Sequence, residues 1–302
     1  MTWTTTQITH VNKMNRAAKD VQLGTMLANL GSTTSTRIYA DPSGSDTTGD
    51  GSIANPVASL TKAMTLVSAN RLIIMLAPGE YVEVAPVVWT TTKNAVVMGA
   101  GNNCTSISTT GASVITVTPG VQASTFTGHI EGITIDHSGI TTGVTHAQSG
   151  ITFDNTGITR NLVFSIKNCA FSADAITDKS INIATHADAD HAVRVYVSGD
   201  GTQTEIEGAI YFAVNNLADR LHCEQLWIKG TITTTNPAKE FRMRLYRCIV
   251  PYGAATAGGS STQVITSVNS YSWVDYKDIV PEVYAALATG DLTGSHTEVI
   301  VA

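Results

Sequence analysis

The sequence predicts an all-β protein: a right-handed parallel β-helix with a short N-terminal helix and a small C-terminal helix and strand extension. Three observations predict this class. Charged residues make up only 14% of the 302 residues, against about 25% in an average globular domain. The chain is rich in Thr and Gly, and β-branched side chains favour extended backbone. Short apolar segments recur along the chain, separated by turn-forming residues.

Residues 1–36 form a first segment, which differs from the β-rich remainder. Within VNKMNRAAKDVQLGTMLANLG, apolar residues recur at helical spacing with charged residues between them. This apolar face consists of Val11, Met14, Ala18, Val21 and Met26. Two interpretations stay open. The helix covers an open end of the solenoid, or it is an anchor that docks on another protein.

The predicted solenoid covers residues 37–252 and begins with a strand and a turn-rich loop, RIYADPSGSDTTGDGSIANP. A short helix is expected next, in VASLTKAMTLVSA, because the apolar residues of this segment fall on one helical face. That face consists of Leu60, Ala63, Met64 and Val67. The following run, RLIIMLAPGEYVE, predicts a strand buried on both faces and ended by a Pro-Gly turn, which is typical of parallel sheet.

The motifs YADPSGSD, GDGS, NP, SLTKAM and LIIMLAPGEYVE follow one another between Tyr39 and Glu83. This order resembles the opening of pectate-lyase-like right-handed β-helix proteins. The resemblance implies that the short helix covers the first coil and that the PGEY turn leads into the stack. It implies no particular chemistry, because that superfamily contains lyases, hydrolases, epimerases and inert structural shafts.

Apolar strand-like segments continue beyond Glu83 without a strict period, from NAVVMGAG to FRMRLYRCIVPYG. With one coil per about 20 to 25 residues, we expect roughly eight coils between Leu72 and Pro251. Small or Asn-containing corners, such as the one at Asn168, are expected between strands. The four cysteines have neither zinc-ligand nor disulfide spacing, and the apolar surroundings of most of them predict buried thiols.

Residues 253–302 form the predicted C-terminal extension, with a Gly- and Ser-rich loop, a short helix at 281–289 and a final strand, HTEVIVA. An apolar edge strand invites pairing with another chain unless it is covered. Trp273 and Tyr276 belong to the most aromatic stretch of the sequence, which would suit a contact surface. Packing of these two residues into a core is the alternative.

Composition excludes several functions. A net charge of −6, with 18 scattered basic residues, is unlike a nucleic-acid-binding protein. No apolar run approaches the length of about 18 residues that a membrane span needs. The first residues lack the order of a secretory signal, so we expect synthesis as a soluble cytosolic chain. No motif predicts a cofactor or a metal ion.

Asp136, His137 and Asp154 are the best catalytic candidates. The segments ITIDHSG and ITFDNTG share one frame, and on successive coils they would bring Asp136 close to Asp154. Two carboxylates about 5 to 9.5 Å apart are what glycoside hydrolysis requires. However, an Asp that ends a strand is commonly a turn former. The motifs that mark pectin hydrolases are absent, and we therefore expect no enzyme.

The leading hypothesis is a structural protein of a tailed bacteriophage particle, either a capsid decoration protein or a head or tail appendage. Such a protein would be assembled in the host cytoplasm and exposed on the virion surface. It would form a homotrimer and bind the major capsid protein, or another virion protein, through the N-terminal helix. The alternative is a tailspike-like protein that binds or depolymerises a surface glycan near Asp136 and Asp154.

Overall fold

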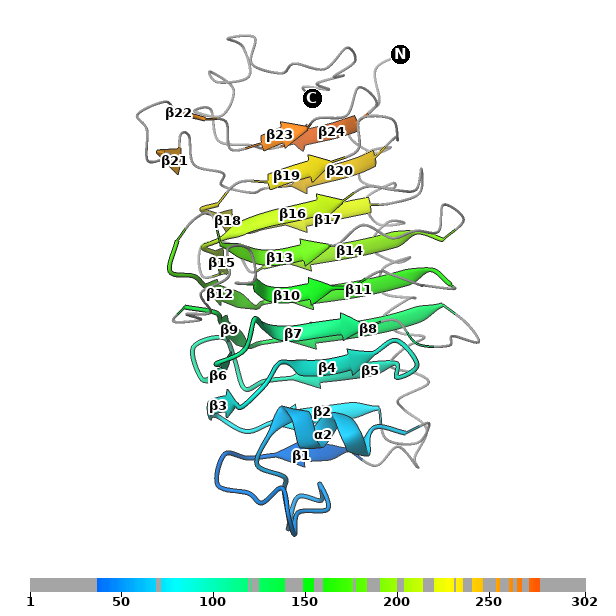
Figure 1. Cartoon of the computed structure of the whole chain (residues 1–302), viewed down its shortest axis with the longest axis vertical. Helices are drawn as coiled ribbons and strands as arrows, with labels where there is room; N and C mark the ends of the chain where they lie inside the picture. Colours follow the sequence, from blue (N-terminus) through cyan, green and yellow to red (C-terminus); the bar gives the residue numbers. More distant parts are fainter. Residues whose placement is uncertain are drawn as a thin grey trace, which may run out of the picture.

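The computed structural model shows strands stacked along one long axis in three parallel sheets (Figure 1). It describes residues 37–68, 72–118, 120, 125–138, 149–154, 160–175, 178–183, 191–199, 204–213 and 220–230, together with the backbone of later strands up to residue 277. This arrangement is a right-handed parallel β-helix, as the sequence predicts.

Each sheet collects one strand from successive coils. Sheet A contains β1 (Ile38–Ala40), β2 (Ile73–Leu76), β5 (Ala95–Met98), β8 (Phe126–Glu131), β11 (Leu162–Lys167), β14 (Val193–Ser198), β17 (Arg220–Glu224), β20 (Phe241–Tyr246) and β24 (Ser272–Lys277). Sheet B contains β4 (Val87–Thr90), β7 (Ser113–Thr118), β10 (Ser149–Phe153), β13 (Lys179–Ile183), β16 (Ala209–Ala213), β19 (Ile232–Thr235) and β23 (Ile265–Ser267). Sheet C contains β3 (Gly79–Glu83), β6 (Thr105–Thr109), β9 (Thr134–Asp136), β12 (Ala170–Ser172), β15 (Glu205–Ile206) and β18 (Trp227–Ile228). A separate antiparallel pair joins β21 (Ala254–Ala255) to β22 (Ser261–Thr262).

From β2 to β19 each coil passes from sheet A to sheet C to sheet B. Alternate side chains of strands such as β11 and β14 point into the interior. In sheet A, one interior position is held in turn by Val97, Ile130 and Ile166, all fully buried. The later register partners Cys223 and Leu245 lie closer together in sequence. Coil length therefore varies, and this explains why the sequence has no strict repeat.

The corner after the sheet A strands uses left-handed backbone. Gly132, Asn168 and Gln225 have φ angles of 69°, 50° and 56°. The corner residue also continues the ladder, because the Asn168 N–H donates to the Ser198 carbonyl of the next coil at 2.8 Å. Asn tolerates this conformation better than most residues with a side chain. The corner that the sequence predicts at Asn168 is confirmed.

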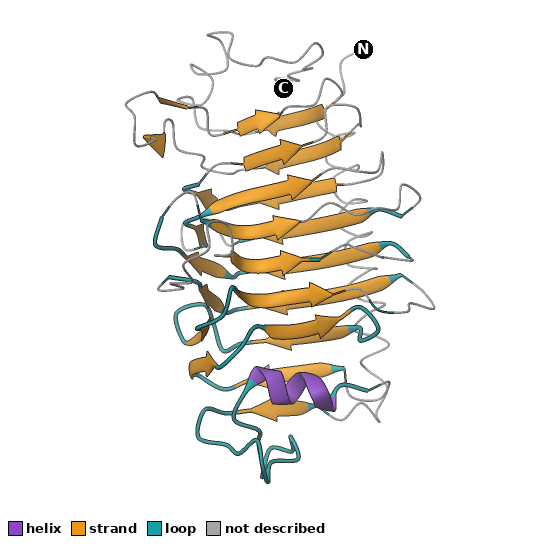
Figure 2. Cartoon of the chain, in the orientation of Figure 1, coloured by secondary structure: helices purple, strands orange, loops and turns teal. Residues whose placement is uncertain are grey.

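The helix α2 (Leu60–Leu66) lies at the N-terminal end of the stack, beside β1 and β2 (Figure 2). The side chain of Ser59 accepts from the Lys62 N–H at 3.0 Å and caps the helix start. The expected apolar face is confirmed, since Leu60, Ala63, Met64 and Val67 are buried. The helix thereby covers the first coil.

The β-helix does not end at residue 252, the boundary expected from the sequence. Strands β23 and β24 lie beyond it and extend sheets B and A. Trp273 and Tyr276 belong to β24, and so to the solenoid ladder rather than to a separate extension. The predicted contact residues Val11, Met14, Ala18, Val21 and Met26 lie outside the described residues, as do the helix at 281–289 and the final strand. No described helix is long and apolar enough to cross a membrane.

Candidate functional site

Asp136 and Asp154 do not occupy equivalent positions. Asp136 ends β9 of sheet C, where its neighbours in the adjacent coils are Ser108 and Ser172. Asp154 follows β10 of sheet B in the same coil. The expectation that the shared frame stacks these two carboxylates on successive coils is therefore corrected. The Asp136 carboxylate also accepts from the Ser138 N–H at 3.0 Å and from the Ser138 hydroxyl at 2.6 Å, so it takes part in a turn.

His137 lies inside the solenoid and is fully buried. Its Nε2 lies 3.1 Å from the Ser180 hydroxyl, which is itself fully buried and accepts from the Gly208 N–H at 2.9 Å. Burial lowers the pKa of His137 below 6.5, although nearby acidic residues, chiefly Asp178, oppose this effect. The pair resembles a nucleophile and its base in composition, but a substrate cannot reach it without opening the coil.

The structure describes three of the four cysteines. Cys169 and Cys223 are buried, as expected, whereas Cys104 is exposed and Cys248 lies outside the described residues. Burial raises the pKa of Cys169 to about 12, which leaves an inert thiol. Among the described residues, no group of three or more His, Cys, Asp or Glu side chains could hold a metal ion.

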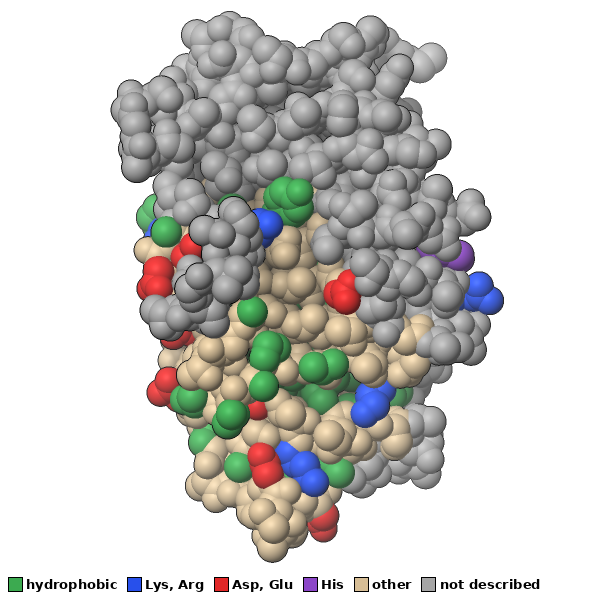
Figure 3. Space-filling view, viewed as in Figure 1, with side chains coloured by type: hydrophobic (Ala, Val, Ile, Leu, Met, Phe, Trp, Pro, Cys, Tyr) green, Lys and Arg blue, Asp and Glu red, His purple; other side chains and the backbone are tan. Residues whose placement is uncertain are grey.

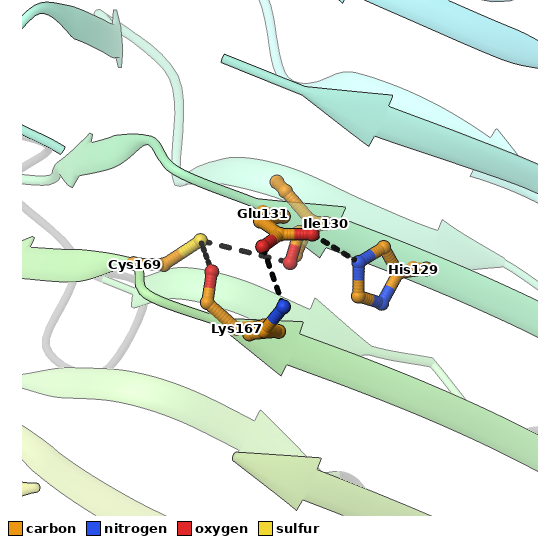
Figure 4. Close-up of polar contacts among 5 residues, drawn as sticks. All are labelled: His129, Ile130, Glu131, Lys167 and Cys169. Carbon is orange, nitrogen blue, oxygen red and sulfur yellow. Dashed lines mark hydrogen bonds and ion pairs between the residues drawn. The ribbon is translucent and has the colours of Figure 1, made fainter. Parts of the chain in front are cut away.

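The outer face of sheet A carries a cluster of charged groups on β8 and β11. On β8 the His129 Nε2 lies 3.2 Å from the Glu131 carboxylate, and the Lys167 ammonium of β11 lies 2.8 Å from the same carboxylate (Figure 4). The hydrogen bond from His129, together with Lys167, lowers the pKa of Glu131 to about 2 against the effect of burial. Since all three groups satisfy one another, this cluster stabilises the stack.

The same face continues along β14 and β17 with outward residues that are partly exposed. Arg194 lies directly opposite Arg220, and Tyr196 directly opposite His222. The Tyr196 and His222 ring centroids are 6.1 Å apart with an interplanar angle of 37°. The His222 Nε2 lies 3.5 Å from the Glu224 carboxylate. We name Arg194, Tyr196, Arg220 and His222 the arginine face.

Sequence reasoning did not single out the arginine face. The alternation in AVRVYVSGD and RLHCEQ shows that these residues point outward, but not which of them become neighbours. Two adjacent guanidinium groups beside two rings can bind an anion. The arginine face does not contain the pair of free carboxylates that acid and base catalysis of glycoside cleavage requires.

On the surface seen in Figure 3, charged side chains are sparse among uncharged ones over the described coils. Fold and surface together define a right-handed β-helix protein with a predominantly uncharged shaft and a local basic face. A family model described as "Protein of unknown function (DUF1565)" matches residues 42–234, and the chain belongs to this family.

Comparison with curated proteins gives no match. Among solved structures, "Pectin methylesterase from Carrot" is similar, with a TM-score of 0.46 and 12% sequence identity over 88% of each chain. At this level the likeness bears on neither activity nor substrate.

Proposed function

We propose that the chain is a non-enzymatic structural protein of a tailed-phage particle, a capsid decoration protein or head appendage. In this proposal residues 1–36 dock on the major capsid protein or another virion protein. The solenoids project from the virion surface as a homotrimer.

The observation that carries the proposal is the position of α2. Leu60, Ala63 and Met64 of this helix already bury the start of the first coil. A solenoid needs covers at its ends. Because α2 covers the N-terminal end of the solenoid, residues 1–36 are not needed as a cover at that end. This favours the interpretation of residues 1–36 as an anchor over their interpretation as a cap.

The placement of the catalytic candidates supports a structural role. Asp136 and Asp154 lie on different sheets, and His137 and Ser180 are sequestered in the interior. The alternative function, a glycan-depolymerising spike acting through Asp136 and Asp154, therefore loses the juxtaposition on which it depended.

Three forms of the protein test the proposal: the full chain, a chain of residues 37–302, and the full chain with Val11→Asp and Met14→Asp. The sedimentation of each is measured alone and with undecorated capsids of the phage whose genome encodes the chain. We expect trimers of the full chain to co-sediment with capsids, and both altered forms to stay in solution while keeping a β-rich circular dichroism spectrum. The full chain carrying Asp136→Asn is the control and should bind like the unaltered protein.

Two results would overturn the proposal. One is full-chain protein that remains unbound at saturating capsid concentration. The other is release of oligosaccharide from a bacterial surface polysaccharide that the Asp136→Asn, Asp154→Asn double variant no longer produces.

A further inference from the structure

One of the two columns of the arginine face consists of like charges. Arg194 of β14 pairs in register with Arg220 of β17, and Arg242 of β20 occupies the next register position. Adjacent strands are about 4.8 Å apart, so the first two side chains leave the sheet within contact distance of each other. Like charges directly opposite one another destabilise a sheet. The fold tolerates a repulsion here that a mixture of charges would remove.

The Nε atoms of Arg194 and Arg220 have no hydrogen-bond partner among the described residues. Both atoms are buried. Neither side chain forms an ion pair within the part of the chain that the structure describes. A buried donor without an acceptor costs free energy, and more when it belongs to a charged group. Both observations are explained if an anionic group from outside the chain bridges the two arginines.

The surroundings of this pair indicate what carries the anion. Tyr196 and His222 form the neighbouring column, with ring centroids 6.1 Å apart. Aromatic rings offer an apolar face and polar edge atoms to a ligand that has both kinds of surface. A sugar ring has this character, with C–H groups on its faces and hydroxyls around its rim. A lone inorganic anion would need the arginines but not the two rings.

The column of arginine positions runs along the long axis of the solenoid. Arginine positions follow one another at the strand spacing along the long axis of the solenoid, and Trp273 of β24 occupies the position after Arg242. Such a row matches a linear polymer whose acidic groups recur along its length. With a net charge of −6, the chain as a whole does not attract nucleic acid.

We propose that the arginine face binds an anionic glycan, with a carboxylate or sulfate group bridging Arg194 and Arg220 and a sugar ring lying against Tyr196 and His222. This inference goes beyond the structural function proposed above and does not rest on it. It also places glycan binding on sheet A, away from Asp136 and Asp154.

The test measures binding of the full chain to immobilised heparin, polygalacturonate and dextran, which carry sulfate, carboxylate and no charge. We expect one or both acidic polymers to bind and dextran not to bind. The double variant Arg194→Gln, Arg220→Gln should bind about tenfold more weakly or worse, because two charge-assisted contacts are lost. The matched control Arg37→Gln, Lys62→Gln removes the same charge from the far end of the solenoid and should bind normally.

Thermal unfolding accompanies each binding measurement. Because the substitution removes two like charges that lie directly opposite one another, the Arg194→Gln, Arg220→Gln variant should unfold at the same temperature as the unaltered protein or higher. Arg194→Lys, Arg220→Lys keeps the charge but not the bidentate geometry, and it should also bind more weakly. Equal loss in the two charge-matched double variants would overturn the proposal, as would binding of single-stranded DNA as tight as that of the acidic glycans.

Discussion

The Lys167 ammonium lies 2.8 Å from the Glu131 carboxylate, across the β8–β11 pair of sheet A. These two residues are direct register partners, so one ion pair joins two successive coils. His129 approaches the same carboxylate from its own strand at 3.2 Å. The outer face of sheet A thus carries a compensated cluster on β8 and β11 and, on the next two strands, two arginines whose Nε atoms have no hydrogen-bond partner among the described residues.

Glu131 should make the fold sensitive to acid. The pKa of its carboxyl falls from 4.5 to about 2 in the folded chain, first because of the His129 hydrogen bond. The unfolded chain therefore binds more protons in this interval, and the stabilisation is present above 4.5 and lost as the pH falls towards about 2. We expect urea unfolding to show a steeper acid loss for the unaltered protein than for Glu131→Gln.

Glu80→Gln is the matched control for this experiment, because Glu80 is exposed on β3. Each of the two variants removes one carboxyl group, so a difference between them reports on the position of Glu131. An acid loss in Glu131→Gln equal to that of the unaltered protein would show that the cluster contributes nothing to stability.

His137 should make the free energy of unfolding depend on pH in a different range. Burial lowers its pKa below 6.5, so the unfolded chain takes up a proton first as the pH falls. Stability due to the neutral imidazole is therefore present above 6.5 and declines below it, until the folded pKa is reached. His137→Asn should flatten the stability profile just below 6.5, measured by urea unfolding, even if it lowers stability throughout. A loss of stability below 6.5 that is as steep in His137→Asn as in the unaltered protein would show that the buried imidazole does not cause it.

Substitutions at Gly128 and Phe164 should have non-additive effects on the free energy of unfolding. A Cβ atom at Gly128 would lie 2.5 Å from the Phe164 ring, which packs against Trp89 and Phe153 with centroid distances of 5.1 Å. Gly128→Ala should therefore lower the free energy of unfolding by about 1 to 3 kcal/mol through overpacking. Phe164→Leu, which frees this space, should make the added methyl group less costly.

Urea unfolding of the two single variants and the double variant measures this coupling. The double variant should be more stable than the sum of the single losses predicts. Strict additivity would mean that the backbone of β8 moves away from β11 instead.

The sequence predicts the opening of the fold well, because the signals there are local. The spacing of Leu60, Ala63 and Met64 specifies the buried face of α2. The turn after Leu76 and the corner at Asn168 likewise follow from neighbouring residues.

Contacts between coils could not be predicted in the same way. Asp136 and Asp154 have nearly the same local sequence, yet one ends a strand of sheet C and the other follows a strand of sheet B. The pairing of Arg194 with Arg220 depends on the length of a whole coil, which varies along the chain and has no local signature. The arginine face was missed for this reason.

The contact between Glu83 and α2 should control the stability of the N-terminal end. Glu83 is almost fully buried, and its carboxylate accepts from the Leu60 N–H at 2.7 Å. Glu83→Ala leaves this N–H unpaired and should lower the free energy of unfolding by about 1 to 3 kcal/mol. Glu83→Gln keeps an acceptor and should cost less. Hydrogen exchange measures the effect locally: amides of α2 and β2 should exchange faster in Glu83→Ala, while those of β11 and β14 keep their protection. Uniform acceleration along the solenoid would show instead that the first coil and its helix unfold together with the whole stack.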